Sequence, residues 1–139
     1  MEQADFVFQV IRIRKALRRE FEERAAALGI TAAQFRVLHR LWEGDGIHTS
    51  VLCCEGGSDA GTITGVLDRL EAKGLVRRER DLEDRRAVRV LLTPGGRELE
   101  QPLNEILRAL DEQAMRGFSV EERGCLMRLL ERAGGNLGA

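Results

Sequence analysis

Residues 62–93 read TITGVLDRLEAKGLVRRERDLEDRRAVRVLLT, and the hydrophobic period changes in the middle of this stretch. Four apolar residues of the first half recur at steps of one, three or four: Ile63, Val66, Leu67 and Leu70. This spacing predicts a helix with one buried face that runs to Lys73. Gly74 follows directly, and glycine is the residue that most often ends a helix in the left-handed conformation.

The second half of the stretch predicts a β-hairpin. Residues 75–80 and 87–92 are two short β-prone runs, and residues 81–86, DLEDRR, separate them. Two such runs joined by a short charged segment are typical of a hairpin. Because six residues exceed a tight turn, we expect the loop to project from the sheet.

A short helix and a glycine turn precede this stretch. Residues 49–55 can form one helical segment, Gly56 and Gly57 a turn, and Ser58 or Asp59 the cap of the next helix. The order of short helix, turn, second helix and basic hairpin predicts a winged helix-turn-helix lobe over residues 31–93. The predicted fold class is mainly α, of the α+β type, with a two-stranded β wing.

Longer helices are predicted on both sides of the lobe. Residues 5–28 carry an apolar stripe that either faces a core or forms a dimer seam: Phe6, Val10, Ile13, Leu17 and Phe21. Three further helix starts follow from capping signals: Thr31 with Gln34, Thr93 with Pro94, and Ser119 with Glu122. Gly29 is the expected end of the first helix.

The charge distribution is uneven. The 139 residues have a formal net charge of −1, yet residues 69–97 contain nine basic and five acidic side chains. A basic segment on an acidic body is what binding to phosphates requires, although a solvated charged face has the same composition.

Other classes of function find little support. The two histidines, His39 and His48, and the cysteines Cys53, Cys54 and Cys125 show no zinc-ligand spacing, and no catalytic motif is present. We therefore expect no enzyme activity, no metal and no cofactor. Without a signal peptide or a membrane span, a cytoplasmic protein with reduced thiols is expected. Packing is the favoured interpretation of Cys53 and Cys54, and redox sensing remains the alternative for any of the three cysteines.

Small and polar residues near the start of the second helix can approach DNA closely. Thr62 and Thr64 can contact phosphates or a thymine methyl group. In the hairpin loop, Arg85 and Arg86 can reach an adjacent groove, with Asp84 orienting one guanidinium.

These motifs together resemble the multiple-antibiotic-resistance regulator (MarR) family. The matching segments are T62IT, L67DRLE, K73GLVR, D84RRAV and L92TPGG, with T31AAQFRVL upstream. They lie within residues 31–38 and 62–96, which together make up about a third of the chain. The resemblance implies a homodimer in which the first and last helices of both subunits intertwine, so residues 1–28 and 94–134 become dimerisation helices of one domain, 1–139.

The resemblance also implies a function and a set of contacts. The second helix would enter the major groove and Arg85 or Arg86 the minor groove of a pseudo-palindromic operator in double-stranded DNA. Many members are repressors that a small aromatic or phenolic effector releases. The candidate DNA-binding residues are Ser58, Asp59, Ala60, Gly61, Thr62, Thr64, Arg69, Arg77, Asp84, Arg85 and Arg86. The candidate effector-binding residues are Arg14, Arg36, His39 and Trp42.

Some interpretations stay open, and one position departs from the family. His39 and Trp42 suit a core as well as an effector pocket. A winged helix that binds a protein instead of DNA remains an alternative, which would show no salt-dependent duplex binding. Gly65 stands where the family often has a long polar residue. Glycine removes a possible base contact there, so we expect Arg69 and the wing to contribute more to DNA recognition.

Overall fold

The computed structural model describes residues 5–55 and 60–139. Its elements, in chain order, are α1 (Asp5–Ala25), the 3₁₀ turn η2 (Ala26–Leu28), α2 (Ala32–Glu43), β1 (Ile47–His48), α3 (Thr49–Glu55), α4 (Ala60–Ala72), β2 (Val76–Arg80), β3 (Val88–Leu92), α5 (Pro94–Glu98), α6 (Glu100–Ala114) and α7 (Val120–Asn136). The chain divides into two compact units, Met1–Leu107 and Arg108–Ala139. The mainly helical fold class with a small sheet is confirmed.

The sheet is antiparallel, with strand order β1-β3-β2. The hairpin of β2 and β3 is confirmed, with Val76 opposite Leu92 and Arg80 opposite Val88. The prediction of two strands was incomplete, because β1 pairs with β3 on its other edge. A two-residue strand is too short to show a hydrophobic period, so no sequence pattern indicated it.

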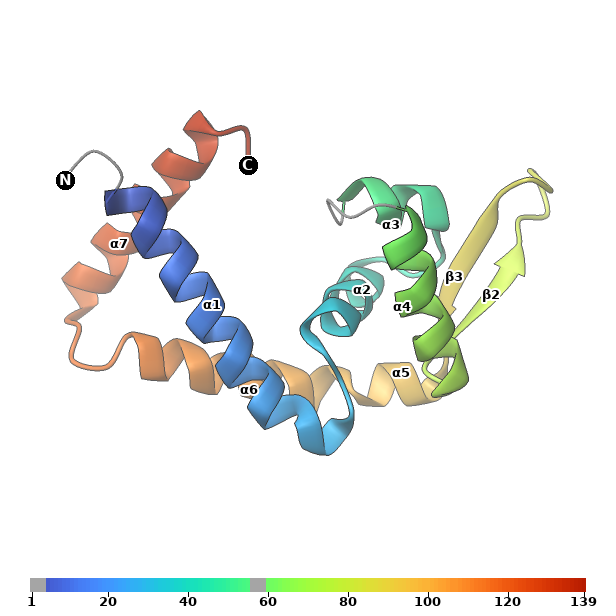
Figure 1. Ribbon diagram of the computed structural model, residues 1–139, viewed down its shortest axis with the longest axis horizontal. Helices are drawn as coiled ribbons and strands as arrows, with labels where there is room; N and C mark the ends of the chain where they lie inside the picture. The colour runs from blue at the N-terminus through green and yellow to red at the C-terminus, as the bar shows by residue number, and fades with distance from the viewer. Residues whose placement is uncertain (1–4, 56–59) are drawn as a thin grey trace. The chain divides into compact units, whose positions relative to one another are not determined.

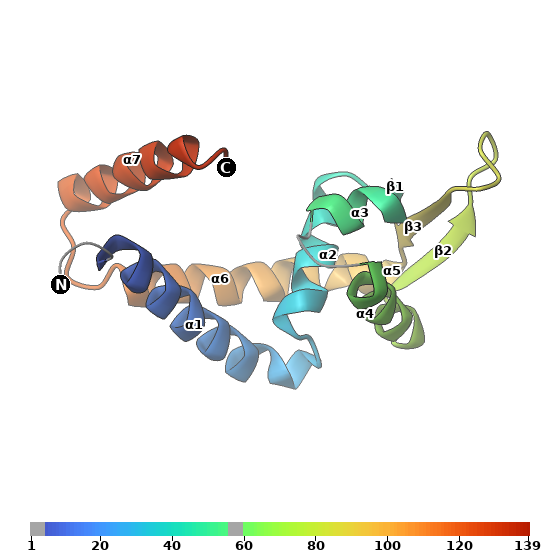
Figure 2. The ribbon, with the colours of Figure 1, turned by 45° about the horizontal axis from the view of Figure 1, so that its top comes forward.

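The core of the first unit lies under α4. Its apolar face is buried as predicted, and α4 packs against α2, α3 and β2. The largest fully buried side chains are Leu38, Leu41, Leu67, Leu70, Val76, Val90 and Leu103. Figure 1 shows the hairpin of β2 and β3 running beyond the ends of α3 and α4, and the second view in Figure 2 agrees. The helices α3 and α4 are therefore packed on the core, and the loop between β2 and β3 projects beyond it.

Local capping signals set most helix ends. Thr31 and Gln34 form a reciprocal capping box, and Ser119 and Glu122 form another at the start of α7 in the second unit. Thr93 caps α5 by accepting a hydrogen bond from the Gly96 amide at 3.1 Å. Gly74 has a φ of 72°, so it ends α4 in the left-handed conformation.

The helix expected from Pro94 onward is instead two helices, α5 and α6, and this corrects the prediction. Pro102 lies in the first turn of α6. It lacks the N–H that would donate to the Glu98 carbonyl, and its ring would crowd that carbonyl in a continuous helix. The break at Leu99 places proline where a helix tolerates it.

Candidate nucleic-acid interface

The exposed part of α4 carries candidate contacts on two faces. Ser58 and Asp59 lie outside the described residues, and α4 begins at Ala60, followed by Gly61. Thr62 and Arg69 are exposed and seven residues apart, so they share one face of the helix. Thr64 is also exposed. Because it is only two residues from Thr62, it lies on another face of the helix.

Gly65 lies between Thr62 and Arg69 on the exposed face. A Cβ atom built there meets no atom within 4 Å. We expect Gly65→Ala to raise the free energy of unfolding by about 1 kcal/mol, because alanine restricts the unfolded chain and favours a helix. Urea denaturation at fixed protein concentration measures this, and a lower midpoint would mean that the position is not open.

Most basic side chains of residues 69–97 form hydrogen bonds or ion pairs with other groups of the protein. Five of the nine basic side chains contact protein groups: Lys73, Arg77, Arg78, Arg89 and Arg97. The other four are exposed and make no side-chain hydrogen bond or ion pair within residues 5–55 and 60–139: Arg69, Arg80, Arg85 and Arg86. These four side chains could therefore bind a phosphate without first giving up a hydrogen bond to the protein. Arg80, at the end of β2, was not among the predicted site residues, because sequence does not show which arginines are paired.

Arg78 braces the wing against α4. Its Nη2 lies 2.5 Å from Asp68 Oδ1 and 3.1 Å from Glu71 Oε1, and its backbone N–H donates to the other Glu71 oxygen at 3.1 Å. These hydrogen bonds raise the pKa of Arg78 and lower the pKa of Glu71 below its usual value. Both carboxylates lie on one face of α4, so Arg78 links β2 to that face of the helix.

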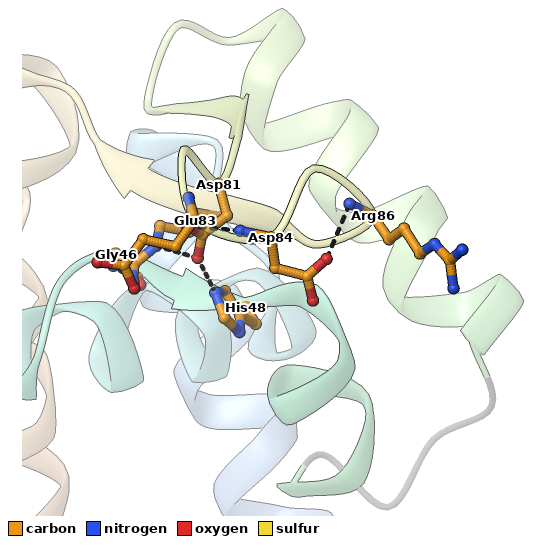
Figure 3. A network of polar contacts seen from close by, with 7 residues as sticks. Gly46, His48, Asp81, Glu83, Asp84 and Arg86 are labelled. Atoms are coloured by element: carbon orange, nitrogen blue, oxygen red, sulfur yellow. Dashed lines mark hydrogen bonds and ion pairs between the residues drawn. The ribbon is translucent and has the colours of Figure 1, made fainter.

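Asp81 anchors the base of the hairpin loop, as Figure 3 shows. Its side chain is buried, and Oδ1 accepts from the amide of Glu83 at 2.9 Å. Oδ2 lies 2.6 Å from His48 Nε2 and 3.0 Å from Arg89 Nε. Because an ionised carboxylate only accepts hydrogen bonds, Nε2 of His48 carries a hydrogen.

These donors keep Asp81 ionised. The Glu83 amide, then His48 and Arg89, hold the pKa of Asp81 well below its usual range. A carboxyl whose folded pKa is depressed contributes stability above its unfolded pKa, and the contribution is lost only as pH falls through the folded value. The anchor is therefore intact at every pH used for DNA binding. The sequence prediction missed Asp81, His48 and Arg89, which are brought together from three segments.

Residues 84–87 form the turn at the tip. The amide of Ala87 donates to the Asp84 carbonyl at 3.0 Å, so Arg85 and Arg86 occupy the two central positions. Asp84 Oδ1 accepts from the Arg86 amide at 3.1 Å. The interpretation that Asp84 orients a guanidinium is wrong. The Asp84 carboxylate instead accepts a hydrogen bond from a backbone amide of the turn, as aspartate often does at the first turn position. In Figure 3 the Arg86 side chain points away from the network.

We expect Asp81→Asn to weaken duplex binding by about tenfold, because its amide nitrogen would face the donors of His48 or Arg89 and loosen the loop. Charge alone predicts the opposite, since removing a negative charge near DNA raises affinity. Glu83→Gln is the matched control: the same charge is removed from an exposed side chain, and affinity should hold or rise. Fluorescence anisotropy with a labelled duplex measures both, and equal affinities for the two variants would exclude a positioning role for Asp81.

A small pocket of about 230 Å³ lies between α2, α3 and α4. Arg36 and His39 line it, together with Leu52, Thr62 and Val66. Arg14 and Trp42, the other candidate effector residues, are not among its lining residues. The indole N–H of Trp42 donates to the Gly96 carbonyl at 3.0 Å and so links α2 to α5.

The cysteines occupy different surroundings. Cys53 is half-buried and lines an open groove of about 630 Å³ beside Thr64 and Arg80, whereas Cys54 and Cys125 are exposed. All three are free thiols.

Across residues 5–55 and 60–139, no helix combines the length and apolar character that a membrane span needs.

A helix pair joined to a hairpin with exposed arginines at its tip defines a winged helix-turn-helix DNA-binding protein. The family model described as MarR family matches residues 30–88. The HTH-type transcriptional regulator YdgJ of Bacillus subtilis is 34% identical over 137 residues, covering 98% of this chain and 81% of the relative. The chain belongs to the MarR family of transcriptional regulators, and it is a DNA-binding regulator, not an enzyme.

Other comparisons agree. The HTH-type transcriptional regulator TtmR of Methylorubrum extorquens is 34% identical over 120 residues, covering 86% of this chain but only 60% of that relative. A MarR regulator from Methanosarcina mazei has a crystal structure that matches with a TM-score of 0.87 at 29% identity, covering 95% and 96% of the two chains. A structure of Bordetella bronchiseptica BpsR, whose DNA binding is regulated by 6-hydroxynicotinic acid, matches with a TM-score of 0.81 at 27% identity, covering 94% and 98%.

Proposed function

We propose that this chain is a repressor that binds a pseudo-palindromic operator as a homodimer and is released by a small aromatic or phenolic acid. The observation that carries the DNA-binding mode is the hairpin tip, where Arg85 and Arg86 are exposed on a closed turn and make no side-chain hydrogen bond or ion pair in the described part of the chain. In this proposal the tip contacts the minor groove and α4 enters the major groove.

The first helix supports the homodimer. Its apolar stripe stays exposed except at Phe21: Phe6 is 50% exposed, Val10 40%, Ile13 54% and Leu17 41%. A stripe of this length on the surface is typical of a protein–protein interface. Size-exclusion chromatography with light scattering should give a molar mass of twice the 15.6 kDa of one chain. Ile13→Asp should then shift the mass toward a single chain.

The pocket beside Arg36 and His39 supports the effector. A guanidinium can pair with a carboxylate through two parallel hydrogen bonds, and the mostly apolar lining suits an aromatic ring. BpsR, whose DNA binding is regulated by an aromatic acid, supplies the chemical class. Arg36→Gln should abolish release by such an acid while leaving DNA binding intact.

Footprinting of the purified protein on the DNA upstream of its own gene tests the proposal. We expect two protected half-sites related by a two-fold axis, with centres one helical turn apart. Affinity should fall steeply as salt rises. A panel of phenolic acids and an oxidant should then be added separately. Release by the oxidant alone would contradict the proposed effector and assign sensing to the cysteines, and a footprint of one half-site would contradict the dimer.

A further inference from the structure

Leu82 is 97% exposed, more than any other large hydrophobic residue in the described part of the chain. It contributes nothing to the core, and a single exposed leucine needs no explanation in general. What distinguishes Leu82 is its place in the same closed loop as Arg85 and Arg86. The loop closes where the amide of Asp81 donates to the Ala87 carbonyl at 3.0 Å.

Hydrogen bonds within the chain hold the backbone around Leu82 without any partner. Asp81 Oδ1 accepts from the amides of Glu83 at 2.9 Å and Asp84 at 3.5 Å, so one carboxylate spans Leu82. The same carboxylate is held to β1 and β3 through His48 and Arg89. A side chain on such a loop contributes to binding at a low cost in conformational entropy.

The charges of the loop leave room for an apolar contribution. Beyond the buried Asp81, which is paired with Arg89, the exposed loop carries Glu83 and Asp84 against Arg85 and Arg86. These four formal charges cancel, so general attraction to phosphates is weak at the tip itself. A contact that does not depend on net charge would add to the affinity that Arg85 and Arg86 supply.

We infer that Leu82 packs against the deoxyribose walls of the DNA minor groove when the wing binds. The groove is about 6 Å wide, and its walls are the apolar faces of the sugars. Apolar side chains enter minor grooves in other proteins, beside arginines that read groove width. The inference rests on the proposed function, because it requires the wing to enter that groove.

The test compares Leu82→Ser and Leu82→Met on the footprinted duplex by fluorescence anisotropy across a salt series. Leu82→Ser should lower affinity by about tenfold per dimer, because two apolar side chains no longer pack against the sugars. Leu82→Met keeps an apolar side chain of similar volume and should bind like the wild type. The slope of log affinity against log salt should be unchanged in both, since no charge is altered.

Hydroxyl-radical footprinting locates the contact, because the radical attacks deoxyribose in the minor groove. Leu82→Ser should lose protection at the sugars flanking each half-site and retain the rest. Equal affinity of Leu82→Ser and wild type, equal reductions in both variants, or a changed salt slope would overturn the inference. If the wild-type protein shows no salt-dependent duplex binding, the proposed function itself fails. Thermal midpoints should be unchanged throughout, because the side chain is 97% exposed.

Discussion

Replacing Arg85 and Arg86 together with alanine is expected to lower operator affinity by about a hundredfold or more. Each residue occurs twice in the proposed homodimer, so four guanidinium groups are removed. The effect is enlarged because Glu83 and Asp84 remain exposed and would face the phosphates without their compensating charges. The slope of log affinity against log salt should fall by about one for each phosphate that is no longer neutralised.

The matched control keeps the charge and changes the geometry. Arg85→Lys with Arg86→Lys should retain most of the salt slope, because an ammonium also displaces counterions. It should lose part of the affinity, since lysine lacks the planar fork of arginine. Fold and dimer should persist in both double variants, because both side chains are exposed and make no hydrogen bond or ion pair in the described residues. Wild-type affinity in the alanine variant would remove the wing from the mechanism and leave α4 as the only contact.

Gly96→Ala is expected to be the most destabilising single substitution of those considered, lowering the free energy of unfolding by about 3 kcal/mol. A Cβ at Gly96 would lie 2.2 Å from the backbone oxygen of Leu75 and 3.0 Å from Leu92 Cδ2. The Leu75 oxygen cannot move freely, because it accepts a hydrogen bond from the Thr93 amide at 3.1 Å. Displacing Gly96 would also break the bond from the Trp42 indole.

Gly95→Ala provides the control for this prediction. A Cβ at Gly95 would lie 3.4 Å from the Gly74 oxygen, which is close to ordinary contact. Its effect on stability should therefore be small, within about 1 kcal/mol. Urea unfolding at one fixed protein concentration compares the two, because the stability of a dimer depends on concentration. If the two variants unfold at the same denaturant concentration, the packing of α5 against Leu75 is looser than these distances require.

The surroundings of Gly96 lie beyond what sequence patterns predict. Thr93 and Pro94 indicated the start of a helix correctly, because a cap acts on amides two or three residues away. The close approach of Gly96 to Leu75 joins residues 21 positions apart, and no local pattern encodes it. The same limit hid β1, which is too short to show a period.

Some features of the wing could likewise be predicted from local sequence, and others depend on tertiary contacts. From residues 62–93 alone, the helix, the glycine stop, the hairpin and the exposed arginine tip were predicted, since each depends on neighbours within one turn or one hairpin. Only the tertiary structure decided which arginines are available. Arg78 is bound to Asp68 and Glu71, and Arg97 is bound to Asp45 at 2.7 Å across 52 residues. Ion pairs form between side chains that folding brings together, and hydrophobic periodicity carries no information about them. The sequence therefore determined the elements of the wing, and tertiary contacts determined that Asp81 holds its loop and that Arg69, Arg80, Arg85 and Arg86 remain exposed.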